Sequence, residues 1–495
     1  MPLNATELLV TLDKRGRGPL RVRLAGALRD AVRSGQLEAG TTLPSSRVLA
    51  KDLCVSRGVV VDAYAQLAAE GYVRGRPGAA TTVSDVPAAT LPTGWRDDPE
   101  VSSAVPDLDL RSGWPDLATF PRRQWAAVTR DVLRDLPAAE LGYSEPWGAW
   151  PVRRQLASYL ARVRGAMTAA DGVVIVSGVT QGLTLLTRML LNAGEDRLAV
   201  EDPSNAIQRR LLGRLGVTVV DVPVDGEGLI VEALEDTRTR ALVCTPAHQY
   251  PSGVVLSPAR REQLLRWARE VGGLIIEDDY DAEFRYERPP VSCLQGMDPE
   301  HVALLGSVSK TLAPALRIGW VVTPPSLLAA LRAIKRDDDF GSNAIDQHVL
   351  ARLIESGAYD RHLRGLRRLY RQRRDAFVEA LGRGLPDWQV LESAGGLALT
   401  IVLPPGLSER RLVAAAAGLG LSVLGLEAMT GHTSPAPGIV LSYARATPDM
   451  SAEAVARLIR ASQILDGVTP DQEAAAARDA TLWDDGQQPH QRREP

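Results

Sequence analysis

The sequence predicts a multidomain protein in which a small α+β unit precedes a larger α/β unit. At 495 residues the chain is long enough for two or three domains with separate cores. Between Lys14 and Arg76, twelve Lys or Arg residues stand against five Asp or Glu, although the net charge of the whole chain is only -3. Beyond this basic head, short β-like runs alternate with helical stretches, which is typical of a mostly parallel sheet.

Composition and cysteine usage limit the class of protein. Hydrophobic residues make up 45% of the chain and charged residues 24%, as in soluble globular proteins. No run approaches the roughly 18 apolar residues of a membrane span, and the N-terminus lacks the pattern of a signal peptide. We therefore expect a cytoplasmic protein with no membrane partner. Cys54, Cys244 and Cys293 lack CxxC spacing and the six histidines form no cluster, which favours reduced thiols and no metal.

The basic head, residues 12–83, has the pattern of a winged helix-turn-helix. Apolar residues recur at helical spacing in "PLRVRLAGALRDAVRSG", which closes on Gly35. Ser45 or Ser46 can cap a second helix and Ser56 a third, with a tight turn between the two. The segment "GYVRGRPGAATTV" then reads as a strand, a Gly/Pro turn and a second strand, which together form a basic wing.

The third predicted helix has features of a DNA reader. Val60, Tyr64 and Leu67 share an inward face, which turns Arg57 outward at the start of the helix. Recognition helices present their N-terminal residues to base edges in the major groove. A small helical domain that binds protein, with merely solvated arginines, is the alternative on this pattern alone.

The run "LPSSRVLAKDLCVSRGVVVDAYAQLAAEGYVRGRPG" resembles the winged-helix domain of GntR-type bacterial repressors over nearly its whole length. The resemblance implies a double-stranded DNA partner. The residues it places on DNA are Arg47, Ser56, Arg57, Arg76 and Gly78. Ala79 and Ala80 depart from the family at the wing tip, where a Ser-Gly pair is usual.

Two segments lack the patterns of packed structure. Residues 84–107 are rich in Pro, Ser and Asp without a clear period, which predicts a semi-extended linker. Residues 466–495 are polar and Ala-rich, which predicts a disordered tail after any short helix.

Five strand-like runs in residues 108–465 end in polar or Gly-containing loops. In open α/β sheets ligands bind beyond the carboxyl ends of strands, so we expect the five loops to form one pocket. The runs and their loops are "GVVIVS" with "GVTQ", "RLAV" with "EDPSN", "ALVC" with "TPAHQYPSG", "GLIIE" with "DDYDAEFRY", and "VALLG" with "SVSK".

The residue types in these loops suit one kind of cofactor. Lys310 can form a Schiff base with an aldehyde, and Asp278 can hold a pyridine nitrogen protonated while Tyr280 hydrogen-bonds a ring hydroxyl. Donors for a phosphate come from Ser307, Ser309, Arg317 and the helix that starts near Thr180. This describes pyridoxal 5'-phosphate, PLP. Taken singly, an SxSK is usually a surface loop and a DDY a solvated turn, so the prediction depends on the ordered set.

Over residues 108–465 this order of motifs resembles fold-type I aminotransferases, which combine a mostly parallel sheet with a smaller α+β subdomain. A GntR-like winged helix linked to such a domain is the plan of the MocR/GabR family of bacterial transcriptional regulators, which includes pyridoxine regulators. That plan implies a homodimer in which each winged helix packs on the partner's large domain, and an operator with two half-sites.

The resemblance assigns a role to each matching position. Lys310 would carry PLP, and Tyr143 would reach the phosphate of a neighbouring subunit. The cofactor-binding residues implied are Tyr143, Val179, Thr180, Tyr250, Asp278, Tyr280, Ser307, Ser309, Lys310 and Arg317.

Three positions depart from the aminotransferase pattern. Tyr250 occupies the place of an asparagine that hydrogen-bonds the ring oxygen, and Asn205 that of an active-site tyrosine. Val440 stands where amino-acid transaminases have the arginine that clamps a substrate carboxylate, so a bidentate contact is missing. Arg445 lies nearby in sequence, and the sequence alone does not show that it substitutes.

The arginine-rich stretch "YDRHLRGLRRLYRQRRD", residues 359–375, spreads its charges around much of a helix. We interpret it as a solvated surface helix. A patch that tracks DNA or docks the basic head is the alternative.

Three functions fit these features. We favour a PLP-dependent transcriptional regulator that senses PLP or a PLP-reactive amine and controls vitamin B6 or amino-compound metabolism, with at most residual transaminase activity. The alternative is an active aminotransferase with an appended DNA-binding domain, which would show sustained multiple turnover. A large domain that serves only as a dimerisation scaffold is the third.

Overall fold

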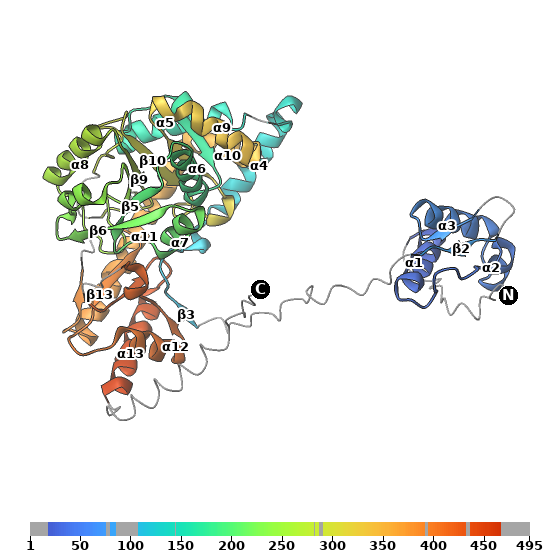
Figure 1. Cartoon of the computed structure of the whole chain (residues 1–495). Coiled ribbons are helices and arrows are strands. Elements are labelled where there is room, and N and C mark those ends of the chain that lie inside the picture. Colours follow the sequence, from blue (N-terminus) through green and yellow to red (C-terminus); the bar gives the residue numbers. More distant parts are fainter. Residues whose placement is uncertain are drawn as a thin grey trace, which may run out of the picture. The chain divides into compact units, whose positions relative to one another are not determined.

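The computed structural model describes residues 18–75, 80–85, 107–143, 145–281, 283–286, 291–391, 395–431 and 436–466. The chain forms two compact units, residues 1–104 and 105–495. Figure 1 draws the first in blue and the second in the remaining colours of the bar. Most of the predicted linker and all of the predicted tail after residue 466 lie outside the described residues.

The N-terminal unit has three helices followed by a two-stranded antiparallel sheet. These elements are α1 (Leu20–Arg33), α2 (Ser46–Asp52), α3 (Arg57–Ala69), β1 (Val73–Arg74) and β2 (Thr82–Val83). The predicted caps are present, because Ser45 Oγ accepts from the Val48 N–H at 3.3 Å and Ser56 Oγ from the Val59 N–H at 3.4 Å.

The inner face of α3 is the predicted one. Val60 and Leu67 have no exposed surface, and Tyr64 packs against the same cluster. Arg57 and Val61 are exposed. The helix therefore presents the start of its outer face to solvent, as a recognition helix does.

The larger unit is built on an eight-stranded sheet of order β4-β11-β10-β9-β8-β5-β6-β7. Six of its strands run in one direction, and only β11 and β7 run against them, which confirms the mostly parallel prediction. The strands are β4 (Val173–Val176), β5 (Arg197–Asp202), β6 (Thr218–Asp225), β7 (Gly228–Leu229), β8 (Ala241–Cys244), β9 (Leu274–Asp278), β10 (Val302–Ser307) and β11 (Gly319–Val322).

Helices cover both faces of this sheet, so its central strands are buried on both sides (Figure 1). Ile175 of β4 points into a core shared with α5 and α10, whereas Val174 and Val176 point into a core shared with α6, α7 and α9. The helices of the unit are α4 (Arg122–Asp135), α5 (Trp150–Arg164), α6 (Val179–Asn192), α7 (Ala206–Leu215), α8 (Pro258–Val271), α9 (Leu328–Asp339) and α10 (Ala344–Glu355). This arrangement leaves the ends of the strands as the place for a ligand.

A smaller α+β part completes the unit, in agreement with the sequence prediction. It contains a four-stranded antiparallel sheet of order β12-β13-β16-β15 and a short parallel pair of β14 with β3. Its elements are β3 (Leu108–Asp109), α11 (Ala358–Gly384), β12 (Gln389–Val390), β13 (Ala398–Val402), α12 (Glu409–Gly418), β14 (Leu421–Ser422), β15 (Leu424–Gly425), β16 (Gly438–Ser442) and α13 (Pro448–Asp466).

The arginine-rich helix α11 is a core helix with one solvated face, and this corrects the expectation of charges spread around its circumference. Leu363, Leu366, Tyr370 and Phe377 are buried along its inner face. Exposed arginines recur at i, i+3, i+7 and i+10. They are Arg361, Arg364, Arg368 and Arg371. Arg367, Arg373 and Arg374 make internal contacts, as Arg373 does with Asp116 at 2.9 Å.

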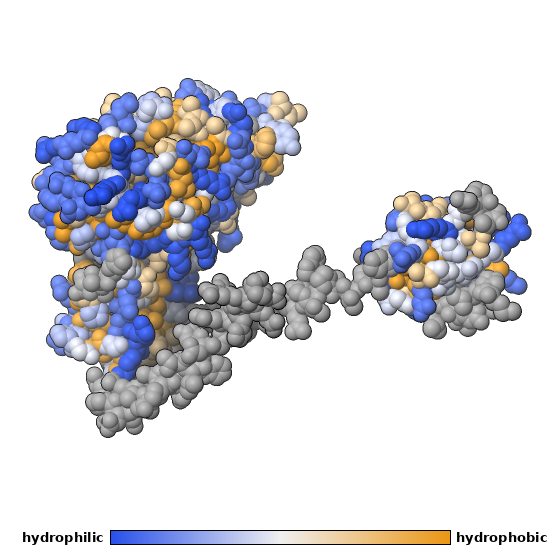
Figure 2. Space-filling model, in the orientation of Figure 1, coloured by the Kyte–Doolittle hydropathy of each residue, from blue (hydrophilic) through white to orange (hydrophobic). Residues whose placement is uncertain are grey.

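The surfaces of the two units visible in Figure 2 are mostly hydrophilic, with scattered apolar patches. Among the described helices, none combines the length and the apolarity that crossing a membrane requires. Within the same residues no group of His, Cys, Asp or Glu side chains is arranged to hold a metal ion.

Because the two units have separate cores, we expect Leu67→Ala to destabilise only the N-terminal one. The substitution leaves a cavity in the inner face of α3 and should cost about 2–5 kcal/mol. Hydrogen exchange of the full-length chain should become faster over α1 to α3 and stay unchanged over β4 to β11. Val61→Ala, on the exposed face of the same helix, is the control. Equal acceleration in both units would contradict separate cores.

Candidate cofactor-binding site

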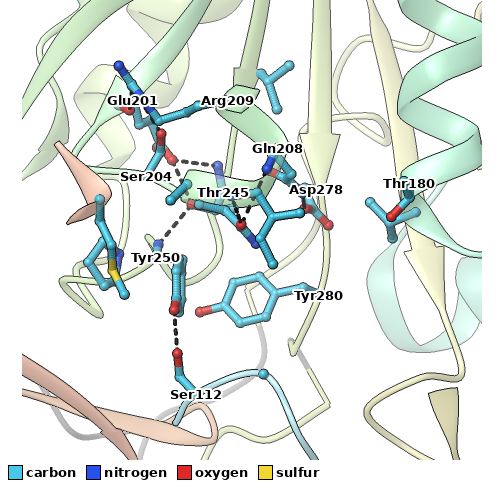
Figure 3. Close-up of a pocket in the computed structure, with 18 of the residues that line it drawn as sticks. Ser112, Thr180, Glu201, Ser204, Gln208, Arg209, Thr245, Tyr250, Asp278 and Tyr280 are labelled. Carbon is cyan, nitrogen blue, oxygen red and sulfur yellow. Dashed lines mark hydrogen bonds between the residues drawn. The ribbon is translucent and has the colours of Figure 1, made fainter. Parts of the chain in front are cut away.

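A cavity of about 560 Å³ lies at the carboxyl ends of the parallel strands. All five predicted loops contribute to it, with Thr180 after β4, Asn205 after β5, Tyr250 after β8, Tyr280 after β9 and Ser309 after β10. The predicted convergence of the loops is therefore present (Figure 3).

Nine of the ten predicted cofactor residues line this cavity. They are Val179, Thr180, Tyr250, Asp278, Tyr280, Ser307, Ser309, Lys310 and Arg317. The exception is Tyr143, whose side chain is 97% exposed and lies beside Phe340, with ring centroids 6.5 Å apart. Tyr143 lines a separate hollow of about 340 Å³ with residues 339–345.

Lys310 follows β10 and projects into the cavity, where its Nζ donates to the carbonyl of Gly113. Burial lowers the pKa of its ammonium group, while Asp278 and Asp281 act in the opposite direction. A lysine with a lowered pKa has a larger fraction of free amine and is the better nucleophile toward an aldehyde.

Asp278 ends β9 as a buried carboxylate with an unused acceptor. Its Oδ2 accepts from Gln208 Nε2 at 2.6 Å, but its Oδ1 has no hydrogen-bond partner among the described residues. Burial raises the pKa of the carboxyl group to about 6, and Asp279 and Asp281 add to the effect. A protonated ring nitrogen would satisfy Oδ1 and favour the charged carboxylate, so this group fits a pyridinium.

The start of α6 and the side chain of Arg317 form a cradle for an anion. The first amides of α6 have no intrahelical acceptor and carry the positive end of the helix dipole. Gly178 precedes them with φ of +89°, and a Cβ added there would lie 3.0 Å from Arg317 Nη2. Ser307 and Ser309 border the same cavity. Together with Lys310 and Asp278, this donor set fits PLP.

Tyr250 and Tyr280 form an aromatic wall of the cavity, with ring centroids 5.7 Å apart in an edge-on arrangement (Figure 3). Tyr250 Oη lies 2.5 Å from Ser112 Oγ, and burial raises the pKa of this phenol. Tyr280 Oη lies 3.0 Å from His248 Nδ1. The two hydroxyl groups therefore have different partners.

Sequence reasoning missed three residues of the site. Ser112 and Gly113 come from the segment after β3, and Gln208 comes from the first turn of α7. Asn205 Oδ1 caps α7 by accepting from the N–H groups of Ile207 at 2.9 Å and Gln208 at 3.4 Å. Asn205 therefore fixes the turn that presents Gln208 to Asp278. The helix-cap pattern in "SNAIQ" could have predicted this turn from the sequence.

Val440 is fully buried and has an apolar environment. It clusters with Leu426 and Met429, and Tyr250 and Leu424 pack against them. Of these, Met429, Tyr250 and Leu424 line the cavity. The wall in front of Val440 is therefore apolar.

Arg445 does not substitute for the missing arginine. Among the described residues it is not one that lines the cavity. Its guanidinium donates to the Asp109 carbonyl and lies 3.5 Å from the Asp109 carboxylate.

The predicted DNA-binding residues cluster at the exposed side of α2 and α3. Arg47, Ser56 and Arg57 are exposed, and Arg57 Nε donates to Ser46 Oγ at 3.3 Å. Arg76 and Gly78 lie outside the described residues.

Two family models match the chain. Residues 20–83 match the bacterial regulatory proteins of the gntR family, and residues 108–459 match aminotransferase class I and II. The probable rhizopine catabolism regulatory protein MocR of Rhizobium meliloti is 31% identical over 490 residues, which cover 95% of this chain and 99% of that protein. The chain belongs to the MocR/GabR-type transcriptional regulators.

Other relatives agree with this family. The HTH-type pyridoxine biosynthesis transcriptional regulator PdxR of Corynebacterium glutamicum is 35% identical over 442 residues, 88% of this chain and 94% of that protein. The multiple substrate aminotransferase of Thermococcus profundus matches 74% of this chain and 94% of its own, with a TM-score of 0.68 and 27% identity. As a MocR/GabR-type regulator, the chain combines a DNA-binding unit with an aminotransferase-like domain whose cofactor is PLP.

We expect Gly178→Ala to weaken PLP binding about tenfold or more. The new Cβ strains a backbone with positive φ, and the guanidinium of Arg317, 3.0 Å from it, must move by a few tenths of an ångström. Gly194→Ala is a matched control, because Gly194 has φ of +88° and no atom within 4 Å of its added Cβ. PLP affinity can be measured by titration of the visible absorbance. Equal affinities of the two variants would show that the cradle does not bind the phosphate.

Proposed function

We propose that the chain is a regulator of transcription whose DNA binding is controlled by PLP, or by an amine that reacts with PLP, at Lys310. PLP is held by Val179, Thr180, Tyr250, Asp278, Tyr280, Ser307, Ser309, Lys310 and Arg317. Bound there, it supplies an electrophilic carbon and an electron-withdrawing ring. The chain's own residues fix its phosphate, its ring nitrogen and the amine of Lys310.

One contrast within the cavity carries this proposal. The cofactor side has nine of the ten predicted residues, with an unused Oδ1 on Asp278 and a lowered pKa of Lys310. The part of the wall in front of the buried Val440 is apolar, with Leu424 and Met429. A carboxylate placed against Leu424 and Met429 would lose hydration there without a charged partner, which is unfavourable. Arg209 and Arg210 also line the cavity, and the guanidinium of Arg209 is paired with Asp221. The site therefore favours retention of PLP over turnover of amino acids.

The signal must favour one arrangement of the DNA-binding units over another, because a ligand shifts an equilibrium only by its differential affinity for the two states. We propose a homodimer, with Tyr143 contributing to the partner's site and each winged helix packed on the partner's large domain. Such a dimer would read an operator of two half-sites through Arg47, Ser56, Arg57, Arg76 and Gly78.

The named relatives support two kinds of target. PdxR is named for the regulation of pyridoxine biosynthesis and MocR for rhizopine catabolism. We propose that this chain controls vitamin B6 or amino-compound metabolism in the bacterial cytoplasm. The apolar wall at Val440 favours PLP itself as the signal.

We expect PLP to change the footprint of the protein on DNA upstream of its own gene. The footprint of Lys310→Ala should not respond to PLP, because the variant lacks the amine that captures the aldehyde. The measurement is DNase footprinting of both proteins with and without PLP.

Arg57→Ala separates the loss of DNA binding from the loss of PLP binding. It should weaken the footprint with and without PLP and leave the visible absorbance of bound PLP intact, since Arg57 lies in the other unit. Identical wild-type footprints with and without PLP would refute the sensor.

A further inference from the structure

His248, Tyr280 and Asp281 form a cluster of hydrogen-bonding groups at the edge of the cavity. His248 comes from the loop after β8, and the other two come from the loop after β9. His248 Nδ1 lies 3.0 Å from Tyr280 Oη and 2.8 Å from Asp281 Oδ2. Asp281 is buried, with 2% of its side chain exposed, and His248 has 11% exposed. The cluster is thus shielded from most of the solvent.

The geometry determines which nitrogen of His248 carries a proton. An ionised carboxylate only accepts, so the contact with Asp281 requires a proton on Nδ1. His248 Nε2 is buried and has no hydrogen-bond partner among the described residues. A proton on Nε2 would therefore be a buried donor without an acceptor, which is costly. The contacts therefore place a proton on Nδ1.

The loop at Gly396 holds the imidazole in this position. A Cβ added at Gly396 would lie 2.3 Å from His248 Cε1 and 3.0 Å from Asp281 Oδ2. The Gly396 carbonyl accepts from the hydroxyl groups of Tyr286 at 2.8 Å and Tyr443 at 2.5 Å. The ring thus packs against a backbone that is itself fixed, which leaves it little room to turn.

Two acceptors compete for the single proton of Tyr280. One is the Asp281 carboxylate, whose Oδ2 lies beside the same His248 Nδ1 as Tyr280 Oη, and the other is an acceptor in the cavity. Burial raises the pKa of Tyr280 well above its usual value, so the phenol keeps its proton. The Nδ1–H of His248 donates to Asp281 Oδ2 and also lies next to Tyr280 Oη. Because Asp281 already accepts this proton, the phenol proton of Tyr280 is free to point into the cavity.

We propose that His248 is a positioning residue that engages Asp281 and thereby reserves the proton of Tyr280 for the ring oxygen of PLP. This inference rests on the proposed PLP site. The cluster has other titratable or charged neighbours. At the cavity they are Asp278, Tyr250 and Lys310, and behind Gly396 they are Tyr286 and Tyr443. The nearby Arg285 donates to the Ala247 carbonyl. All of these groups stay unchanged in the variants that test the proposal.

The test is the pH midpoint of the visible absorbance of bound PLP in the full-length protein. A donor to the ring oxygen stabilises the negative charge on that oxygen. This stabilisation is largest after the Lys310 nitrogen has lost its proton, because a positive nitrogen no longer offsets the charge. Tyr280→Phe removes the donor and should raise the midpoint by about one pH unit. His248→Ala should raise it in the same direction, because the phenol then turns to Asp281.

Two further variants distinguish positioning from a loss of packing. Adding Asp281→Asn to His248→Ala should return the midpoint toward the wild-type value, because the charged competitor for the phenol proton is gone. His248→Asn should keep the wild-type midpoint, because its amide N–H can replace Nδ1–H. A merely loosened site would be restored by neither change.

His301→Ala is the matched control. His301 Nδ1 lies 3.1 Å from Asp298 Oδ1, so it forms the same kind of pair, and among the described residues neither lines the cavity. The pH midpoint of the visible absorbance of His301→Ala should equal that of the wild type.

The outcomes separate this inference from the proposed function. If His248→Ala keeps the wild-type midpoint while Tyr280→Phe shifts it, the positioning role is wrong and the PLP site stands. The positioning role is equally wrong if the double variant keeps the midpoint of His248→Ala. If the wild type shows no visible absorbance that depends on Lys310, the proposed site itself is wrong.

Discussion

The parallel pairing of β9 with β10 is the constraint on which the site depends. The register pairs Leu305 with Asp278, so the carboxylate that ends β9 lies beside the strand that leads to Lys310. Both strands are buried on two faces by helices, and a slip of one residue would turn these side chains toward the opposite face. The sheet thus brings together an acid and an amine that are 32 positions apart in the sequence.

Burial at this edge gives the polar groups their chemical character. Desolvation raises the pKa of Asp278 and lowers that of Lys310, so each group is less charged than it would be in water. Burying these two groups without a ligand is unfavourable. A ligand that offers a positive nitrogen to Asp278 and an aldehyde to Lys310 relieves this cost. The same electrostatics fit PLP, whereas the buried Val440 and its neighbours Leu424 and Met429 provide no charged group for a substrate carboxylate at their part of the wall.

The sequence could predict those parts of the fold and site that depend on local signals. Strand-end loops, serine caps and the inward face of α3 are read from spacing and residue type, and the structure has them where expected. The contributions of Ser112 and Gly113 could not be predicted, because they reach the cavity through the pairing of β3 with β14, which lies more than 300 residues later. The inner face of α11 was misread because Arg373 and Arg374 point inward to partners that are distant in sequence. Charge patterns on a helix do not reveal such partners.

The proposed regulation requires that PLP and DNA influence each other through one protein. Linkage makes this influence reciprocal, so a PLP effect on DNA affinity must appear as an equal DNA effect on PLP affinity. The most direct measurement is therefore the PLP dissociation constant of the full-length protein with and without saturating operator DNA, followed by visible absorbance. We expect the constant to change by the factor by which PLP changes operator affinity, and to be unaffected by DNA of unrelated sequence. An unchanged constant in the presence of the operator would contradict the proposed regulation.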